Sequence, residues 1–451
     1  MEGESEALAA TQTDSQAYEL YLLAKQRIYE RKRVPIEAAV KMLDSALEID
    51  PNYVPALAQR GIATLLLTQS NYGTMPTKMA EPIAKGYIDR AIKLDDGQAD
   101  AWAALGLYHN NRPTEEGKAI EALEKALSIN PNLINASNWL QQSYTGPRNI
   151  SRRISIIEGM IERDPLYKPA IGNAILLYNQ LGQFEKSLAL IERVAVFMPD
   201  DPGLMSNRAM ISAFMGDHAE AIQLYEKSLQ ELPERGVTKI GLGFALLATH
   251  QYEKIANDLM PPFIRIFTLN ILGRTEEATI SAYERAAIGD IEGLFGLLNR
   301  ENRSAELVKY IEERWLDLDA FQKDYQGGII GYDVMLDIAL AYERTGNQDK
   351  FNDAIGRFRD FHEVMIEVGV SGGNYLMQGA SYYALTGDFD QALAYLESVI
   401  EQGGIFTTRI AWQYPALQPL EGDPRFEVLQ AKMIENLNKQ RAELGLEPAT
   451  I

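Results

Sequence analysis

The sequence contains no cysteine among its 451 residues. Disulfide bonds, thiolate metal ligands and cysteine nucleophiles are therefore all excluded. Histidine is also scarce: there are four, and no two are three or four residues apart, as two metal ligands on one helix face would be. The longest apolar runs are far shorter than the roughly 20 residues that a membrane-spanning helix requires. We expect no metal, no cofactor and no membrane span in this chain.

Positive charge is in the minority. The chain has 43 Lys and Arg against 63 Asp and Glu, a net charge of −20. Such a surface repels phosphate backbones and anionic lipids, so we expect no nucleic acid among its partners. The apolar fraction of 46% is ordinary for a globular protein. The length fits about two to four domains or one long repeat array.

One spacing of residues recurs along the chain. A small residue is followed by a large apolar residue four positions later, by a small or apolar residue three later, and by Pro or Asp five later, as in Ala119, Leu123, Ala126 and Pro131. The last residue of each copy lies at position 51, 96, 131, 165, 199 or 233, so most steps are 34 residues. Offsets of four and seven put the first three residues on one helix face, and proline ends the helix.

Glycines mark the turns between these helical patterns. They are Gly182, Gly216, Gly273, Gly346 and Gly387, each followed by a polar or charged residue. Glycine supplies the left-handed backbone conformation of a helix–helix turn at low cost. The sequence therefore predicts a series of helix–turn–helix units.

A helix–turn–helix unit of 34 residues with this spacing resembles the tetratricopeptide repeat. Trp102, Leu105, Gly106 and Tyr108 follow the pattern of the first helix of such repeats, with the tyrosine one place early. The resemblance is strong over residues 36–235, weaker over 236–330, and returns near 336–346 and 375–399. It implies an all-α fold, a tetratricopeptide-type right-handed α-solenoid of antiparallel helix pairs.

Five segments are expected. They are a flexible N-terminal segment (1–16), an N-terminal repeat array (17–260), degenerate helical repeats or a hinge (261–330), C-terminal repeats (331–404) and a capping segment (405–451). The step of 45 residues to position 96 implies an insertion, which we place at Ser70–Pro76. Pro261 breaks the period; we interpret it as the start of a hinge, with a rigid continuation left open.

The two ends of the chain carry a second resemblance. Ala17–Leu22 and Pro415–Met433 resemble the ends of the repeat region in bacterial membrane-anchored transcriptional regulators. Those proteins join a cytoplasmic winged-helix DNA-binding domain, one membrane span and an extracytoplasmic repeat region. The resemblance implies that this chain is the sensor part and lies in the periplasm or another extracytoplasmic space. A cytoplasmic location is the alternative.

The concave groove offers candidate binding residues. In such repeats the first helix of each pair lines the concave surface, and counting from the prolines selects Asn138, Gln142, Asn173, Asn179 and Asn207. An amide both donates and accepts hydrogen bonds, which suits an extended peptide. Asn173 and Asn207 are 34 residues apart, so they occupy equivalent places. The alternative is that these amides pair with neighbouring backbone or water between helices.

These patterns favour a non-enzymatic scaffold that binds a peptide or protein segment. No catalytic residue is assigned, because the sequence has no P-loop, dinucleotide fingerprint or Gly-x-Ser-x-Gly motif. One alternative is an enzyme on a paired-helix α/α-toroid, such as a glycosidase, which needs longer repeats and a pair of positioned carboxylates. Another is a homo-oligomerisation module, so a homodimer stays open.

Overall fold

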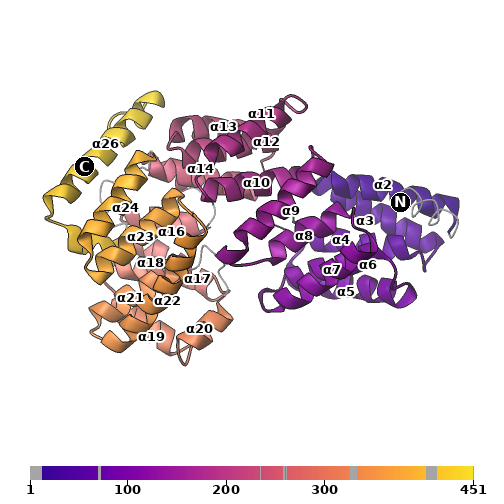
Figure 1. Ribbon diagram of the computed structural model, residues 1–451, viewed down its shortest axis with the longest axis horizontal. Helices are drawn as coiled ribbons and strands as arrows, with labels where there is room; N and C mark the ends of the chain where they lie inside the picture. The colour runs from indigo at the N-terminus through magenta and orange to yellow at the C-terminus, as the bar shows by residue number, and fades with distance from the viewer. Residues whose placement is uncertain are drawn as a thin grey trace. The chain divides into compact units, whose positions relative to one another are not determined.

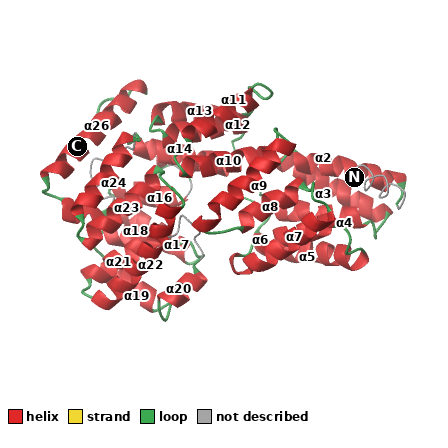
Figure 2. Ribbon diagram, in the orientation of Figure 1, coloured by secondary structure: helices red, strands yellow, loops and turns green. Residues whose placement is uncertain are grey.

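The chain folds into helices joined by short turns. The computed structural model describes residues 13–69, 73–233, 235–256, 260, 262–325, 333–402 and 414–449. Every regular element in these ranges is a helix, and no strand occurs there (Figures 1 and 2). The predicted all-α fold, a tetratricopeptide-type solenoid of antiparallel helix pairs, is confirmed. Pro261 and most of the N-terminal segment 1–16 lie outside the described residues.

The chain divides into two compact units. Unit 1 comprises Met1–Thr145 and Asn149–Ala174, and unit 2 comprises Gly146–Arg148 and Ile175–Ile451. The division passes through helix α10 (Lys168–Gln180). It therefore does not coincide with the boundary that the sequence analysis places between residues 260 and 261.

Unit 1 consists of helix pairs, each packed within itself and against the next. The helices are α2 (Ser15–Tyr29), α3 (Arg33–Ile49), α4 (Val54–Leu66), α5 (Thr77–Leu94), α6 (Ala99–Asn110), α7 (Glu116–Ile129), α8 (Ile134–Ser143), α9 (Ile150–Arg163) and the start of α10, with short 3₁₀ turns η1 (Pro113–Glu115) and η2 (Pro147–Asn149). The stretch between α4 and α5 contains the insertion expected at Ser70–Pro76, of which residues 70–72 are not among those described.

Small residues set the distance between paired helices. Ala119 and Ala126 of the recurring spacing are fully buried on α7. On the facing helix α6, a Cβ atom added to Gly106 would lie 2.3 Å from the Cγ of Leu123. Only glycine permits this approach, so the leucine side chain packs directly on the α6 backbone.

In unit 1 the first helices of successive pairs, α2, α4, α6 and α8, contact one another in turn. The side chain of Arg31, in the turn after α2, donates to Asn135 at the start of α8 over 2.6 Å. The hydroxyl of Tyr167 donates to the same amide oxygen over 2.8 Å. Nearly every residue of α4 is buried. The inner helices of unit 1 therefore pack on one another and leave α4 little exposed surface.

Unit 2 continues the same architecture with helices of more varied length. They are α11 (Phe184–Ala195), α12 (Pro202–Phe214), α13 (His218–Glu231), α14 (Gly236–Ala248), α15 (Tyr252–Ile255), α16 (Pro262–Ile271), α17 (Thr275–Ala286), α18 (Glu292–Arg300), α19 (Ser304–Glu312), α20 (Leu318–Asp324), α21 (Asp333–Arg344), α22 (Gln348–Glu367), α23 (Gly373–Thr386), α24 (Phe389–Glu401), η4 (Pro415–Leu420) and α26 (Pro424–Glu443) (Figure 1). No helix in the described ranges has the length and apolar character of a membrane span.

A residue with positive φ lies in the turn of every helix pair of unit 2 that begins with α10, α12, α14, α16, α18, α21 or α23. These turn residues are Gly182, Gly216, His250, Gly273, Asn302, Gly346 and Gly387. The five predicted glycine turns are therefore confirmed. The steps between turn residues are 34, 34, 23, 29, 44 and 41. The period is lost because helix lengths change, as in α15 with four residues, while the turn itself persists.

Residues late in unit 2 form hydrogen bonds with residues early in unit 2. The backbone N–H groups of Ser371 and Gly372, between α22 and α23, donate to the carbonyl of Gln180 over 3.2 and 3.1 Å. The side-chain oxygen of Gln440 on α26 accepts the N–H of Ala219 on α13 over 2.8 Å. These contacts between residues far apart in sequence close unit 2 on itself.

Candidate functional site

Two of the predicted groove amides come together in unit 1. The Nδ2 of Asn173 on α10 donates to the Oδ1 of Asn138 on α8 over 3.0 Å. Asn138 is only 4% exposed, whereas Asn173 is half-buried. Gln142, one turn further along α8, is exposed. The Asn138 oxygen is thus already used between helices, and Gln142 presents the more accessible amide.

The other two predicted amides lie in unit 2 and differ from each other. Asn179 is fully buried, and its Oδ1 accepts from the Ser187 hydroxyl over 2.7 Å. This matches the alternative in which the amide pairs between helices. Asn207 on α12 is half-buried and forms no side-chain hydrogen bond to any described residue. Of these two predicted amides, Asn207 is the one not engaged by another described residue.

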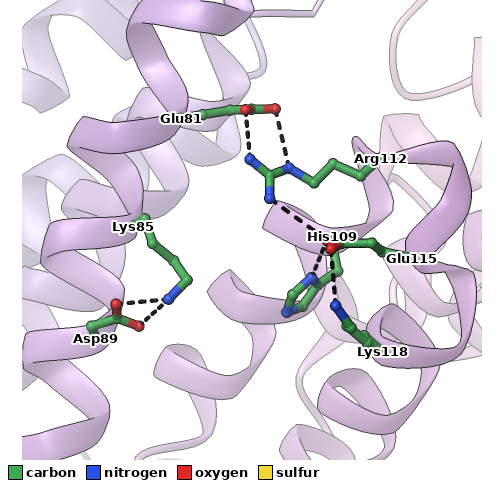
Figure 3. Close-up of polar contacts among 7 residues, drawn as sticks. All are labelled: Glu81, Lys85, Asp89, His109, Arg112, Glu115 and Lys118. Atoms are coloured by element: carbon green, nitrogen blue, oxygen red, sulfur yellow. Dashed lines mark hydrogen bonds and ion pairs between the residues drawn. The ribbon is translucent and has the colours of Figure 1, made fainter.

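A charged cluster in unit 1 links α5, α6 and α7 (Figure 3). Arg112 forms two hydrogen bonds with Glu81, of 2.6 and 3.4 Å. The Glu115 carboxylate accepts hydrogen bonds from His109 Nδ1 over 2.7 Å and from Lys118 Nζ over 3.0 Å. Hydrogen bonds from His109 and then Lys118 lower the pKa of Glu115 to about 2. Each carboxylate here has a cationic partner, so the cluster ties helices together and is complete without a ligand.

In unit 2, positions on the first helix of each pair can be compared by counting back from the turn residue of that pair. We call the first members of the pairs the first helices. Each first helix from α12 to α23 contacts the next one. The residues six positions before the turns at Gly182, Gly216, His250 and Gly273 are Leu176, Met210, Phe244 and Phe267. We call these four the apolar row. Leu176 is 37% and Phe244 53% exposed, and Met210 and Phe267 are half-buried. Large apolar side chains therefore recur at one register and are at least partly accessible on all four helices.

A second register lies one helical turn earlier. Asn173 and Asn207 precede their turn glycines by nine residues, and so does Asp337, which precedes Gly346 by nine. Asp337 therefore occupies the place that the sequence analysis assigned to groove amides, although the sequence analysis missed it. Gly346 was the residue in the sequence from which the position of Asp337 could have been counted. Counting from the prolines failed there because the 34-residue period ends before α21.

Asp337 lies near a second carboxylate on the neighbouring first helix α18, Glu292. We call them the carboxylate pair. Asp337 Oδ1 accepts from Asn299 Nδ2 over 3.0 Å, and Glu292 Oε1 accepts from the Tyr325 hydroxyl over 2.5 Å. Neither carboxylate forms an ion pair within 4.0 Å with a described residue. Both are held by neutral donors, unlike Glu81 and Glu115 of unit 1.

The surroundings make both members of the carboxylate pair hard to ionise. Burial is the main cause that raises the pKa of Asp337 to about 6, and the negative charge of Glu292 adds to it. Burial likewise raises the pKa of Glu292. Hydrogen bonding by Asn299 and the charges of Arg300 and Arg344 oppose the rise at Asp337 without cancelling it. Burial therefore outweighs the attraction of two nearby guanidinium groups.

Two further polar side chains lie on α18 and on the neighbouring first helix α16. The Arg300 guanidinium carbon lies 4.6 Å from the centre of the Phe267 ring, and burial lowers the pKa of Arg300 to about 10. Asn270 on α16 is 5% exposed and donates to Glu301 Oε1 over 2.6 Å. Its Oδ1 has no hydrogen-bond donor among the described residues. A buried acceptor without a donor is costly.

Metal chemistry has no support in the described part of the chain. No group of three or more His, Asp or Glu residues there is arranged to hold a metal ion. The assignment of no catalytic residue and no cofactor stays a prediction.

Comparison with known proteins bears on the repeats. Two segments match family models described as tetratricopeptide repeat, residues 203–231 and residues 374–402. The first covers α12 and α13, and the second covers α23 and α24. Each matched segment is therefore one helix pair of unit 2.

The similar proteins are remote. PEX5-related protein from Mus musculus is 24% identical over 165 residues, which are 34% of this chain and 29% of that protein. The Homo sapiens protein of the same name is also 24% identical over 165 residues, 26% of its length. The chain thus spans less than a third of the length of these relatives.

Among solved structures, the human IFIT1 dimer with m7Gppp-AAAA is 12% identical with a TM-score of 0.42, over 78% of this chain and 92% of that chain. The human IFIT1 dimer with PPP-AAAA is 14% identical with a TM-score of 0.34, over 72% of this chain and 68% of that one. The family models and the helix pairs together show that this chain carries tetratricopeptide repeats.

Proposed function

We propose that the chain is a non-enzymatic scaffold that binds an extended segment of a protein on the first helices of unit 2. The observation that carries this proposal is the apolar row. Its members recur at one register on four first helices, and two of them are substantially exposed. Solenoids of this kind use the long surface along their first helices for binding.

The register beside the apolar row adds hydrogen-bonding groups. Asn207 lies three residues before Met210, so the two side chains are neighbours on one face of α12. An extended segment places its side chains alternately on two sides and presents N–H and C=O groups between them. Apolar side chains of the segment would pack on the row while its backbone bonds Asn207. Each square ångström of apolar surface buried contributes about 25 cal/mol.

The relatives agree with this proposal. Tetratricopeptide repeats matched at residues 203–231 include both Asn207 and Met210. The proposal concerns unit 2, where the apolar row lies, whereas Asn138, Gln142 and Asn173 of the predicted groove belong to unit 1.

The experiment is a selection of random twelve-residue peptides displayed on phage against the purified full-length chain. The enriched peptides are then titrated against the wild type and a Met210→Asp, Phe244→Asp double variant. Charges on the apolar row should weaken binding about tenfold or more, because an apolar contact is replaced by a carboxylate that must be desolvated. Phe244 is half exposed, so the variant should fold.

Leu316→Asp is the matched control. Leu316 is 93% exposed, lies between α19 and α20 and is not part of the apolar row. Its substitution should leave the affinities unchanged. Peptides that bind the double variant as tightly as the wild type would refute the proposed surface.

A narrower proposal concerns the larger protein to which the scaffold belongs. We propose that the scaffold is the extracytoplasmic sensor part of a transcriptional regulator, supported by the resemblance at Ala17–Leu22 and Pro415–Met433. The test is the natural reading frame around this sequence together with fractionation of the tagged natural protein. A frame without a winged-helix domain and a membrane span would rule this proposal out.

A further inference from the structure

We propose that Arg153 on α9 and Gln141 on α8 form a binding site for a carboxylate group. Both residues belong to unit 1, so this site is independent of the apolar row of unit 2. Its support comes from the place of the two residues in the repeat, from a buried amide donor without an acceptor, and from a guanidinium without an anionic partner.

The two residues occupy places where most other helix pairs have small residues. The recurring spacing begins with Arg153 on α9, whereas its other copies begin with a fully buried Ala or Ser: Ala39, Ala84, Ala119, Ser187 and Ala221. Gln141 lies ten residues after the last residue of a copy, a place held elsewhere by Gly61, Gly106, Ile175, Ala209 and Gly243.

Long side chains at these places change how the pair packs. At Gly106 the missing side chain lets Leu123 of the paired helix pack on the α6 backbone. Helices α8 and α9 pack on each other less extensively than α6 and α7 do. Between α8 and α9, Arg153 and Gln141 therefore form a polar contact in the place of a close apolar one.

The amide of Gln141 leaves one group unsatisfied. Gln141 is fully buried, and its Oε1 accepts from Arg153 Nε over 3.4 Å. Its Nε2 has no acceptor among the described residues. Turning the amide over would set Nε2 against the Arg153 donor, so this hydrogen bond fixes the orientation of the amide. A buried donor without an acceptor is costly, and an acceptor atom of a ligand would remove that cost.

The guanidinium of Arg153 lacks a counter-ion among the described residues. It is partly buried, and burial is the one cause that lowers its pKa, with no carboxylate acting to raise it. The adjacent Arg152, by contrast, lies 3.5 Å from Glu124 and 3.9 Å from the centre of the Tyr144 ring. A cation held between helices without an anion is stabilised when an anion approaches it.

The open groups of Arg153 and Gln141 are donors that together carry a single positive charge. A carboxylate has two acceptor oxygens in one plane and a single negative charge, so it matches the planar guanidinium and can also accept from Gln141 Nε2. A phosphate dianion would bring a second negative charge into a partly buried site, where Arg152 is already paired with Glu124. Free organic acids and the Asp or Glu side chains of a polypeptide both offer a carboxylate.

The test follows the Nε–H resonance of Arg153 and the side-chain amide resonance of Gln141 by NMR, in the isotopically labelled and deuterated full-length chain. Sodium acetate replaces sodium chloride stepwise at constant ionic strength. Acetamide, which has the shape of acetate without its charge, is the control ligand. The amide of N-acetylglutamate presents the same carboxylate as a polypeptide side chain does, and inorganic phosphate is titrated for comparison.

Three variants are titrated in parallel. Arg153→Ala restores the small residue of the other copies and should weaken acetate binding about 10- to 150-fold. Gln141→Leu removes the buried donor and should weaken it about 3- to 10-fold. Arg152→Ala, the matched control, should leave it unchanged.

In the wild type we expect acetate to shift both resonances until they saturate, and acetamide and chloride to leave them in place. Tighter binding of the N-acetylglutamate amide than of acetate would assign the carboxylate to a polypeptide side chain, and the reverse would assign it to a free acid. Resonances that acetate leaves unmoved, or that acetamide or chloride moves equally, would overturn the inference whether or not the variants fold. Tighter binding of phosphate than of acetate would overturn the choice of a carboxylate.

Discussion

Asn299 holds Asp337 through a single amide group that donates twice. Its Nδ2 lies 2.9 Å from the backbone oxygen of Asp337 and 3.0 Å from its Oδ1. Asn299 itself accepts from the hydroxyl of Ser304 over 3.2 Å. The carboxylate is therefore fixed in position by neutral hydrogen-bond donors, while Arg300 and Arg344 act on its charge from a distance.

Replacing Asp337 by Asn should stabilise the chain at neutral pH. Asparagine keeps an oxygen for Asn299 and removes the charge whose burial raises the pKa from 3.8 to about 6. The folded state holds that proton more tightly than the unfolded state, so this carboxylate makes wild-type stability fall as the pH rises from about 4 to about 6. We expect urea titrations at pH 7 to give Asp337→Asn a free energy of unfolding about 1–2 kcal/mol higher than that of the wild type. This difference should shrink at pH 4.

Asp360→Asn serves as the control for this prediction. Asp360 is a 74% exposed carboxylate of α22, and its substitution should change the free energy of unfolding by less than about 0.5 kcal/mol. If Asp337→Asn matched this control at pH 7, burial of the Asp337 charge would not be costly to the folded state.

Gly106 and Gly159 should respond in opposite ways to alanine. Both lie inside helices, where alanine is normally favoured over glycine by about 0.5–1 kcal/mol. A Cβ at Gly106 would lie 2.3 Å from Leu123, whereas a Cβ at Gly159 of α9 meets nothing within 4 Å. Gly106→Ala should destabilise by about 1–3 kcal/mol through overpacking. If the melting temperatures of both variants shifted in the same direction, helices α6 and α7 would be less closely packed at Gly106 than in this structure.

The sequence predicted helix pairs and turns well because both depend on local residues. The small residues Ala119 and Ala126 are buried, and the glycine turns are left-handed. The accessibility of the groove amides was less predictable, since Asn138 and Asn179 are engaged by Asn173 and Ser187 of other helices. Repeat position gives the helix face of a side chain but not the partners that neighbouring helices bring to it.

The carboxylate pair shows a different limit. Glu292 and Asp337 are 45 residues apart, on helix pairs whose lengths have departed from the 34-residue period. Positions on α18 and α21 can be aligned only by counting back from the turn residues Asn302 and Gly346, and Asn302 is not a glycine. A left-handed asparagine looks ordinary in a sequence, so the α18 turn, and the place of Glu292 ten residues before it, became apparent only from the backbone.

The contact that closes unit 2 can be tested at one hydrogen bond. Gln440 accepts the buried N–H of Ala219 over 2.8 Å. In Gln440→Leu this N–H loses its partner, at a cost of about 1–3 kcal/mol. Amide hydrogen exchange in the peptide that contains Ala219 should accelerate about 5- to 150-fold.

Gln430→Leu is the matched substitution on the same helix, because Gln430 makes no side-chain hydrogen bond to a described residue. It should leave exchange at Ala219 unchanged. Equal acceleration in both variants would mean that leucine disturbs α26 in general and that the single bond does not hold it to α13.

The most direct test of the central claim is to locate a bound peptide on the first helices of unit 2. A photoreactive benzoylphenylalanine is placed at position 244 in one sample and at position 316 in another, and each is irradiated with a phage-selected peptide. Both native side chains are large and at least half exposed, so both probes are accessible. We predict that the peptide crosslinks at position 244 and not at position 316, and that excess unlabelled peptide suppresses the product. Crosslinking at 316 with none at 244 would contradict the assignment of the binding surface to the apolar row.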